Sequence, residues 1–287
     1  MGERVKSILV FGATGQVATE IRRFEGVTAL SRAEADLSNP SACAAIIAQT
    51  TADAVINVAA YTAVDQAETD TEMAFRVNSK TPAAMAEVAA KRGLPFVHVS
   101  TDYVFNGSGS APWVEDGPTG PLGVYGASKL AGEQGVQAAG GPYAILRTSW
   151  VVSSHGRNFV KTMLRLGAEH DTLDIVADQV GGPTCARDIA ACLMEVASQL
   201  TVDISKTGIY HFAGGPDVSW AEFAREIFAQ AGISCDVVDI TSSEFPTPAL
   251  RPGNSRMDCR KITNVFGVQR PDWRASLTNI LTDLKAI

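Results

Sequence analysis

The chain has 287 residues, of which 46% are hydrophobic and 19% are charged. This balance is that of a globular protein, and it excludes extensive disorder. The net charge of −7 argues against a general binder of nucleic acids or anionic membranes, but it leaves room for a local basic pocket. The length corresponds to one large domain or to two unequal domains.

The cysteines and the start of the chain bear on its location. The five cysteines are scattered and no two form a C-x-x-C pair, so the sequence predicts neither a zinc ribbon nor a redox dithiol. The segment Met1–Ser7 is polar and lacks the apolar stretch of a signal peptide. No run of about 18 apolar residues is present, so no membrane span is predicted. We therefore expect a cytoplasmic protein that binds neither membrane nor nucleic acid.

Short apolar runs alternate with helical segments along the first half of the chain. In chain order, the pattern predicts strand 8–11, helix 16–24, strand 27–30, helix 40–49, strand 54–58, a long helical region that breaks or restarts near Pro82, and strand 96–100. Continuous apolar strands that alternate with helices are typical of a parallel sheet covered on both faces. Because βαβ crossovers are right-handed, the sequence predicts a Rossmann-like, doubly wound α/β fold.

The alternation weakens after about Trp150, and glycine, proline and polar turns become denser between residues 208 and 252. We therefore expect a smaller, less regular C-terminal substrate-binding domain that returns at least once to the main sheet. The predicted division assigns residues 1–150, with a return segment around 173–213, to a dinucleotide-binding domain, and residues 151–172 and 214–287 to the substrate domain.

The first predicted strand runs into a G-x-x-G-x-x-A turn. Gly12 allows a sharp turn, Gly15 lets the backbone approach a pyrophosphate at the helix N-terminus, and Ala18 lets the helix pack on the strand. The position of this turn, directly after an apolar strand, favours dinucleotide binding over a tight turn that binds nothing.

The residues after the second predicted strand bear on the choice of cofactor. An NAD site usually carries a carboxylate at this point, whereas this chain has Ser31 and Arg32. The planar guanidinium of Arg32 suits the 2′-phosphate of NADPH, and a solvated surface arginine is the alternative. Asp36, followed by Leu37, is a candidate contact for the adenine.

Further along the chain, a candidate proton-transfer site is formed by three residues, Thr101, Tyr125 and Lys129. Tyr125 and Lys129 are four residues apart, so they share one face of a helix. A nearby ammonium favours the phenolate and lowers the pKa of a tyrosine, which is otherwise about 10. The hydroxyl of Thr101, at the end of the fourth strand, can hold a substrate carbonyl oxygen. A Y-x-x-x-K pair alone is common on helix surfaces, but its position after the glycine turn and the Ser-Thr-Asp strand end favours carbonyl reduction.

With these motifs, the chain resembles the dTDP-4-dehydrorhamnose reductase family of the extended short-chain dehydrogenases/reductases. The most specific segments are Thr148-Ser149-Trp150 and Arg251-Pro252 with Asn254-Ser255-Arg256. The resemblance runs nearly end to end, and its other segments are residues 12–17, 36–40, 61–68, 100–105, 125–126, 129–133, 147–151, 158–163 and 246–249.

The resemblance implies roles for the matching residues. Tyr125 would donate the proton, and Lys129 would lower its pKa and hold the nicotinamide ribose. Trp150 would pack against the sugar ring, with a core tryptophan as the alternative. Thr101 and Asp102 would contact the sugar. The implied cofactor contacts are Gly12, Thr14, Gly15, Gln16, Val17, Ser31, Arg32, Asp36, Leu37, Ala59, Ala60, Tyr61, Thr62, Tyr125 and Lys129. The implied substrate contacts are Val64, Thr101, Asp102, Tyr125, Trp150 and, for the diphosphate or nucleotide, Asn158, Arg251 and Arg256.

The activity that the resemblance implies is NADPH-dependent reduction of the 4-keto group of dTDP-4-dehydro-6-deoxy-L-mannose to dTDP-L-rhamnose. One alternative is a reductase of another nucleotide-linked 4-ketosugar. A second is a non-catalytic, cofactor-binding subunit that resembles the β subunit of methionine adenosyltransferase.

Three points stay open at the level of the sequence. NADH is the alternative cofactor, although Ser31 argues against it. Some family members form a dimer bridged by a metal through glutamates, and Glu20 matches one such position. Because a full set of glutamates cannot be placed, we predict no metal and leave a homodimer open.

Overall fold

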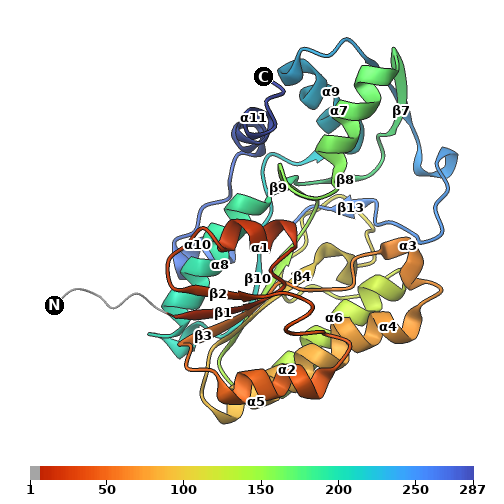
Figure 1. Ribbon diagram of the computed structural model, residues 1–287. Coiled ribbons are helices and arrows are strands. Elements are labelled where there is room, and N and C mark those ends of the chain that lie inside the picture. Colours follow the sequence, from red (N-terminus) through yellow and green to blue (C-terminus); the bar gives the residue numbers. More distant parts are fainter. Residues whose placement is uncertain (1–6) are drawn as a thin grey trace.

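Six parallel strands form the central sheet of the computed structural model, which describes residues 7–287. The polar start of the chain, residues 1–6, lies outside the described residues. The strand order is β10-β5-β4-β3-β1-β2 (Figure 1), and every neighbouring pair is parallel. The strands are β1 (Ile8–Phe11), β2 (Val27–Leu30), β3 (Ala54–Asn57), β4 (Phe96–Thr101), β5 (Tyr143–Thr148) and β10 (Gly208–His211). The predicted parallel α/β sheet is confirmed.

Helices cover both faces of this sheet (Figure 1). Side chains alternate along a strand, so Ile8 and Val10 enter one core while Leu9 and Phe11 enter the other. The first core is closed by α1 (Gln16–Ile21), α8 (Ala186–Leu200) and α10 (Arg260–Phe266), and the second by α2 (Pro40–Gln49), α5 (Thr81–Lys91) and α6 (Val124–Ala138). The strand order reverses between β1 and β3, and ligands of doubly wound sheets bind at the carboxyl ends of the strands at such a point.

The helical region between β3 and β4 is more divided than the sequence predicts. It consists of α3 (Val64–Ala67), α4 (Thr71–Phe75), a π-helical turn (Arg76–Lys80) and α5. Pro82 lies in the first turn of α5, directly after the π-helical turn, so the predicted restart near Pro82 corresponds to the change from π-helix to α-helix. Helix α1 ends at Ile21 rather than at residue 24, and a turn with Gly26 in the left-handed region leads into β2.

A second lobe sits beyond the carboxyl ends of the strands (Figure 1). Its strands are β11 (Val218–Ser219), β8 (Val180–Gly181) and β13 (Asn254–Ser255) in one sheet, and β7 (Thr172–Val176) with β12 (Asp236–Ile240) in another. Its helices α7 (Phe159–Glu169), α9 (Trp220–Ala231) and α11 (Trp273–Asp283) close a third core. The short pair β6 (Val151–Val152) and β9 (Thr184–Cys185) connects the lobes, and 3-10 turns cover Asp102–Val104, Ile204–Lys206 and Ser242–Glu244.

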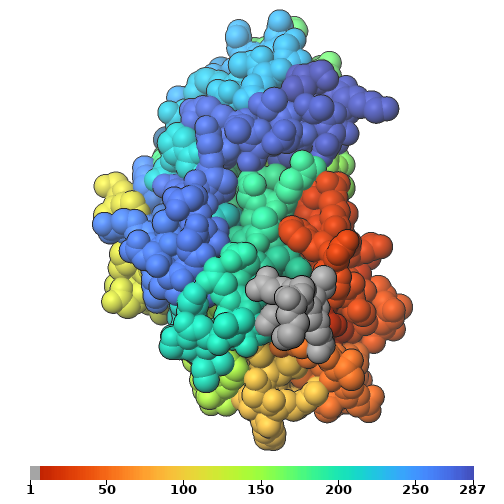
Figure 2. All heavy atoms as spheres, turned by 90° about the vertical axis from the view of Figure 1, so that its left-hand side faces the viewer, coloured from red at the N-terminus to blue at the C-terminus, as the bar shows by residue number. Residues whose placement is uncertain are grey.

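The chain crosses between the lobes several times. Helix α8 and strand β10 return to the large sheet, whereas β7 and β8, which precede them, belong to the small sheets. Figure 2 shows the surface where the C-terminal residues of α11 lie above α8, with α1 beside them. The exact boundaries between the two domains stay a prediction. Within residues 7–287, no helix combines the length and the apolar character that a membrane crossing requires.

Candidate active site

The glycine turn lies beside the end of β3. Gly12 adopts φ 112°, and a Cβ at this position would approach the Cβ of Ala59 to 3.0 Å. Only glycine therefore fits this close approach without strain. Thr14 and Gly15 are exposed at the tip of the turn, and no side chain caps the first turn of α1. The first turn of α1 is thus left without a side-chain cap at the point where the strand order reverses, whereas the amides of Gly12 and Ala13 bind the carbonyl of Leu30.

The structure brings Thr101 and Tyr125 together. Gly126 and Gly132 let α6 approach the backbone at Tyr103 and Asn78, where a Cβ would collide with carbonyl oxygens. This close packing places Tyr125 next to Thr101, which is the last residue of β4. The ring of Tyr125 meets that of Tyr103 edge-on, with 5.4 Å between centroids.

The ionisation of Tyr125 differs from the prediction. Loss of solvent raises the pKa of Tyr125 to about 12, while a hydrogen bond with Thr101 lowers it and the nearby Asp102 carboxylate raises it. The lowering expected from Lys129 is absent, because the Nζ atom of Lys129 faces β4 instead. There it donates to the carbonyl of Val99 at 2.7 Å and lies 3.2 Å from Nε2 of His98.

Lys129 itself is almost entirely enclosed, with 2% of its surface exposed. Burial lowers the pKa of Lys129 to about 8, and the carboxylate of Glu133, one turn further along α6, acts in the opposite direction. A lysine in this environment changes charge close to neutral pH, which is unusual for a group whose ordinary pKa is about 10.4.

Asp102 joins the two lobes. Its carboxylate accepts hydrogen bonds from the hydroxyls of Thr101 and of Ser255, and only 2% of its surface is exposed. Burial raises the pKa of Asp102 to about 6, against the effect of these two hydrogen bonds. Ser255 lies on β13 in the Asn-Ser-Arg segment that the sequence singled out, but sequence reasoning did not assign it to the site.

Trp150 lies between β5 and β6, where the two lobes meet. Its backbone adopts φ 48°, a left-handed conformation that costs a bulky residue about 1–3 kcal/mol. Its ring stacks on that of Trp220 with centroids 3.5 Å apart, and a Cβ added at Gly181 would lie 3.1 Å from it. The surrounding residues thus hold the half-buried Trp150 in one orientation. No motif in the sequence indicated Trp220.

Two predicted phosphate contacts are paired within the chain. The guanidinium of Arg251 forms a two-pronged ion pair with Asp65, next to Val64, with N–O distances of 3.1 and 3.0 Å. Arg251 is close enough to Tyr103 to oppose the rise in the Tyr103 pKa that burial causes. Arg256 donates to Oδ1 of Asn254 at 3.0 Å.

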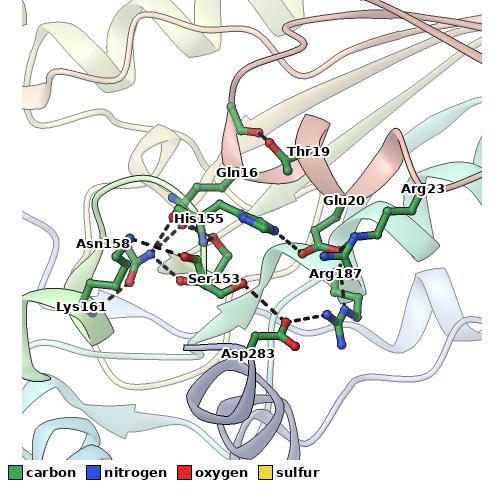
Figure 3. Close-up of polar contacts among 12 residues, drawn as sticks. Gln16, Thr19, Glu20, Arg23, Ser153, His155, Asn158, Lys161, Arg187 and Asp283 are labelled. Atoms are coloured by element: carbon green, nitrogen blue, oxygen red, sulfur yellow. Dashed lines mark hydrogen bonds and ion pairs between the residues drawn. The ribbon is translucent and has the colours of Figure 1, made fainter. Parts of the chain in front are cut away.

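Asn158 connects the second lobe to the glycine turn (Figure 3). Its side-chain nitrogen donates to Oε1 of Gln16 at 2.9 Å and to the carbonyls of Ser153 and His155, while its oxygen caps α7 at Lys161. The chain's own groups therefore occupy the amide of Asn158. In the same close-up, Glu20 accepts a hydrogen bond from His155 and lies 3.3 Å from Arg23 and 3.5 Å from Arg187.

Among residues 7–287, no group of three or more histidine, cysteine, aspartate or glutamate side chains could hold a metal ion. Glu20, the residue considered for a bridging metal, is instead surrounded by the basic side chains just described.

The residues predicted to face the rest of the cofactor lie around the same strand ends. Ser31 donates through its amide and its hydroxyl to the carboxylate of Glu34, a group that sequence reasoning overlooked. The side chain of Arg32 is 80% exposed and lies 3.6 Å from Asp36. The backbone of Tyr61 is held by a hydrogen bond to Asn78 at 2.8 Å. Of the other predicted contacts, Val17, Ala59 and Ala60 are half-buried, Leu37 is buried and Thr62 is exposed.

Comparison with known proteins gives consistent matches over nearly the whole chain. The family model described as the RmlD substrate binding domain matches residues 6–286. The chain is 42% identical to the dTDP-4-dehydrorhamnose reductase of Sinorhizobium fredii over 96% of each chain. It is 39% identical to that of Salmonella typhimurium, over 97% of this chain and 98% of the relative.

Solved structures agree with these matches. A dTDP-4-dehydrorhamnose reductase of Clostridium acetobutylicum has a TM-score of 0.90 at 36% identity, over 97% of this chain and 99% of that chain. The Bacillus anthracis enzyme in complex with NADP has a TM-score of 0.89 at 32% identity, over the same shares.

Proposed function

The chain belongs to the RmlD substrate binding domain family, and from this membership we propose that it reduces the 4-keto group of dTDP-4-dehydro-6-deoxy-L-mannose to dTDP-L-rhamnose with NADPH. The observation that carries the proposal is the contact between Tyr125 and Thr101 beside the buried Lys129. A chain that only binds the cofactor has no need for a phenol and a hydroxyl held together at the strand ends.

The residues present fit a dinucleotide. The Gly12 turn leaves no room for a Cβ, and the exposed amides after it can hold a pyrophosphate. Arg32 is proposed to bind the 2′-phosphate, and its exposure leaves the guanidinium accessible for that contact. When bound, NADPH supplies the hydride that reduces the ketone. Lys129 is proposed to hold the nicotinamide ribose.

Tyr125 is the proposed acid. Because its pKa is about 12, Tyr125 is a protonated phenol at neutral pH, which is the form that can donate. The phenol donates its proton to the oxygen at C4 as that oxygen gains negative charge. The hydroxyl hydrogen of Thr101, which goes to Oδ1 of Asp102 at 3.0 Å in this structure, would turn to the same oxygen when the ketone binds and would hold the ketone against Tyr125.

The sugar nucleotide is proposed to lie between the lobes. Trp150 would bound the sugar ring, and its stacking on Trp220 removes the entropy cost of ordering it on binding. Arg251 and Arg256 are the proposed diphosphate contacts. Both terminal nitrogens of Arg251 bind Asp65, so Arg251 could clamp a phosphate with this fork only by giving up that pairing. Asn158 could contact substrate only by giving up its bond to Gln16.

Location and assembly are further parts of the proposal. The five cysteines are unpaired, which suits the reducing cytoplasm. A homodimer stays a prediction.

Product analysis tests the proposed function. The purified chain is incubated with NADPH and the enzymatically prepared 4-ketosugar nucleotide, and the product is identified by NMR. We expect the L-rhamno configuration at C4, and far less product from Tyr125→Phe in the same incubation time. The opposite configuration at C4, or turnover only with another 4-ketosugar, would identify a different reductase. Cofactor binding without turnover of any ketosugar would instead identify a regulatory subunit.

A further inference from the structure

Gln16 is the first residue of α1, directly after the glycine turn, and its side chain is held from across the junction of the lobes (Figure 3). Its Oε1 atom accepts from the hydroxyl of Ser153 at 2.7 Å and from Nδ2 of Asn158 at 2.9 Å. Both donors belong to segment 153–158, which leads from β6 into α7 of the second lobe. This segment also packs on the side chain, since a Cβ at Gly156 would lie 3.4 Å from Cγ of Gln16. A side chain beside the proposed cofactor site is therefore fixed by residues that lead into the other lobe.

The surroundings of Asn158 determine which way its amide faces. Its nitrogen lies 2.7 Å from the carbonyl oxygen of Ser153 and 3.1 Å from that of His155, and a carbonyl can only accept. Its oxygen accepts from the backbone amide of Lys161 at 3.3 Å and so caps α7. Asn158 therefore presents N–H groups, and not its oxygen, to Gln16.

This arrangement leaves one orientation for the amide of Gln16. An amide nitrogen donates and does not accept, so the Gln16 atom that faces Asn158 must be the oxygen. The hydroxyl of Ser153 accepts from the backbone amide of His155 at 3.0 Å, and its hydrogen can donate to the same oxygen of Gln16. Nε2 of Gln16 has no hydrogen-bond partner within residues 7–287, and it is not sealed from solvent. The two N–H groups of Gln16 are thus available to a ligand at the glycine turn.

We propose that Asn158 and Ser153 are positioning residues for cofactor binding, which keep the N–H groups of Gln16 turned towards the diphosphate of NADPH. A diphosphate offers only acceptors, so a reversed amide would place the oxygen of Gln16 against an anion. A donor that is held in place before binding also avoids the entropy cost of ordering it. Asn158 then contributes to cofactor affinity through Gln16, and it does not act on the substrate.

Two substitutions separate this role from the capping of α7. Asn158→Ser retains a side chain that caps helices well, but it lacks the N–H groups that reach Gln16. Gln16→Met removes the amide and keeps an unbranched side chain of similar length against Gly156. The dissociation constant for NADPH is measured by fluorescence titration for the wild type, for each single variant and for the double variant.

The expected result is a coupling between the two positions. Gln16→Met should weaken NADPH binding by roughly ten- to a hundredfold, the value of a hydrogen bond to a charged acceptor. Asn158→Ser should weaken it by roughly two- to tenfold, because the amide of Gln16 can then turn. In the Gln16→Met background, the serine substitution should change the dissociation constant by less than about twofold, since no amide is left to position.

Asp272→Ala is the control for a loss of stability in the second lobe. The side chain of Asp272 caps α11 by accepting from the backbone amide of Arg274 at 2.9 Å. Its replacement should lower the melting temperature and leave the dissociation constant for NADPH in place. If Asn158→Ser does not fold, Asn158→Asp keeps the cap and removes the donor. The effect of its added charge persists in Gln16→Met, so only the part that disappears there measures the positioning.

Three outcomes would each overturn the role of Asn158. The first is an unchanged dissociation constant in Asn158→Ser or in Gln16→Met. The second is an equal effect of the substitution at Asn158 with and without the amide of Gln16. The third is a weakening in Asp272→Ala as large as that in Asn158→Ser, which would attribute the effect to the stability of the lobe.

The role of Asn158 rests on the proposed function only in taking NADPH as the ligand. The titration needs no ketosugar, so the two can fail separately. NADPH binding with the expected coupling but without ketosugar turnover would reject the proposed function and leave the role of Asn158 intact. Turnover of the ketosugar without coupling between Gln16 and Asn158 would do the reverse.

Discussion

At the scale of single residues, the proposed proton transfer depends on Tyr125 and Thr101. The phenol is surrounded by protein, and its neighbour Asp102 disfavours a second negative charge. Tyr125 therefore holds its proton until a substrate oxygen that is gaining charge can take it. This is the behaviour of a general acid, because the proton moves only as the transition state develops.

Replacement of Tyr125 by phenylalanine keeps the ring and its contact with Tyr103 but removes the acid. We expect kcat to fall by roughly 10²–10⁴-fold, while the dissociation constant for NADPH, measured by fluorescence titration, stays within a few-fold of the wild-type value. Tyr103→Phe is the control, since the two rings pack together and only one is the proposed acid. Turnover of Tyr125→Phe close to that of the wild type would remove Tyr125 from this role.

A second single-residue substitution, at Arg32, tests the choice between NADPH and NADH. Its side chain is 80% exposed, so its loss should not disturb the fold. We expect Arg32→Ala to reduce the preference for NADPH over NADH by roughly ten- to a hundredfold, the value of one charge-assisted contact. Steady-state kinetics with both cofactors measure this preference, and Arg22→Ala, another exposed arginine, should leave it unchanged. Equal use of both cofactors by the wild type would contradict the assignment.

At the scale of elements, the sequence predicts the strands better than the contacts between them. The apolar runs at β1 to β4 begin where the alternation places them, because a buried parallel strand must be apolar along its whole length. The π-helical turn at Arg76–Lys80 has no such signal, since it depends on packing against α6 at Gly132. The contact of His98 with Lys129 likewise depends on how α6 packs against β4. The i, i+4 spacing of Tyr125 and Lys129 therefore could not predict the direction in which the Lys129 side chain points.

The ion pair between Glu133 and Arg147 joins α6 to β5 inside the protein. The two residues expose 1% and 2% of their surfaces, so removal of one charge leaves the other charge buried without an opposite charge beside it. We expect Glu133→Gln to lower the free energy of unfolding by about 3–5 kcal/mol, measured by urea denaturation. The surface pair of Arg165 and Glu169 is the control, and Glu169→Gln should cost less than about 1 kcal/mol. Similar losses for both variants would show that burial is not the deciding factor.

At the scale of the whole molecule, the proposed substrate site depends on how the lobes meet. Trp150 lies at this junction, in a backbone conformation that its neighbours impose. We expect Trp150→Ala to raise KM for the nucleotide-sugar and to leave NADPH affinity within a few-fold, since the glycine turn is untouched. Thermal melting run beside the kinetics separates this from a core role. A large drop in melting temperature together with loss of cofactor binding would indicate that Trp150 is a core residue, whose loss costs about 3–5 kcal/mol.

Asp102 makes the junction of the lobes sensitive to pH. Its pKa is about 6 in the folded chain, against an ordinary 3.8. The folded state therefore binds a proton that the unfolded state has already released between these two values. Stability from this group is greatest below about pH 4 and is lost as the pH rises towards 6 and above. The difference of about 2.2 pH units corresponds to roughly 3 kcal/mol.

Asp102→Asn removes this titration, so the comparison of the two proteins isolates it. Relative to Asp102→Asn, the wild type should be roughly 2.4 kcal/mol more stable at pH 4 than at pH 7 in urea unfolding experiments, because at pH 4 the unfolded carboxyl is already partly ionised. Ser255→Ala provides a second check from the other lobe. The Ser255 hydroxyl lowers the pKa of Asp102, so its removal should move the loss of stability to higher pH. A difference between wild type and Asp102→Asn that stays constant from pH 4 to pH 7 would show that Asp102 is ionised throughout, and that its bond to Ser255 is made by a carboxylate at every pH tested.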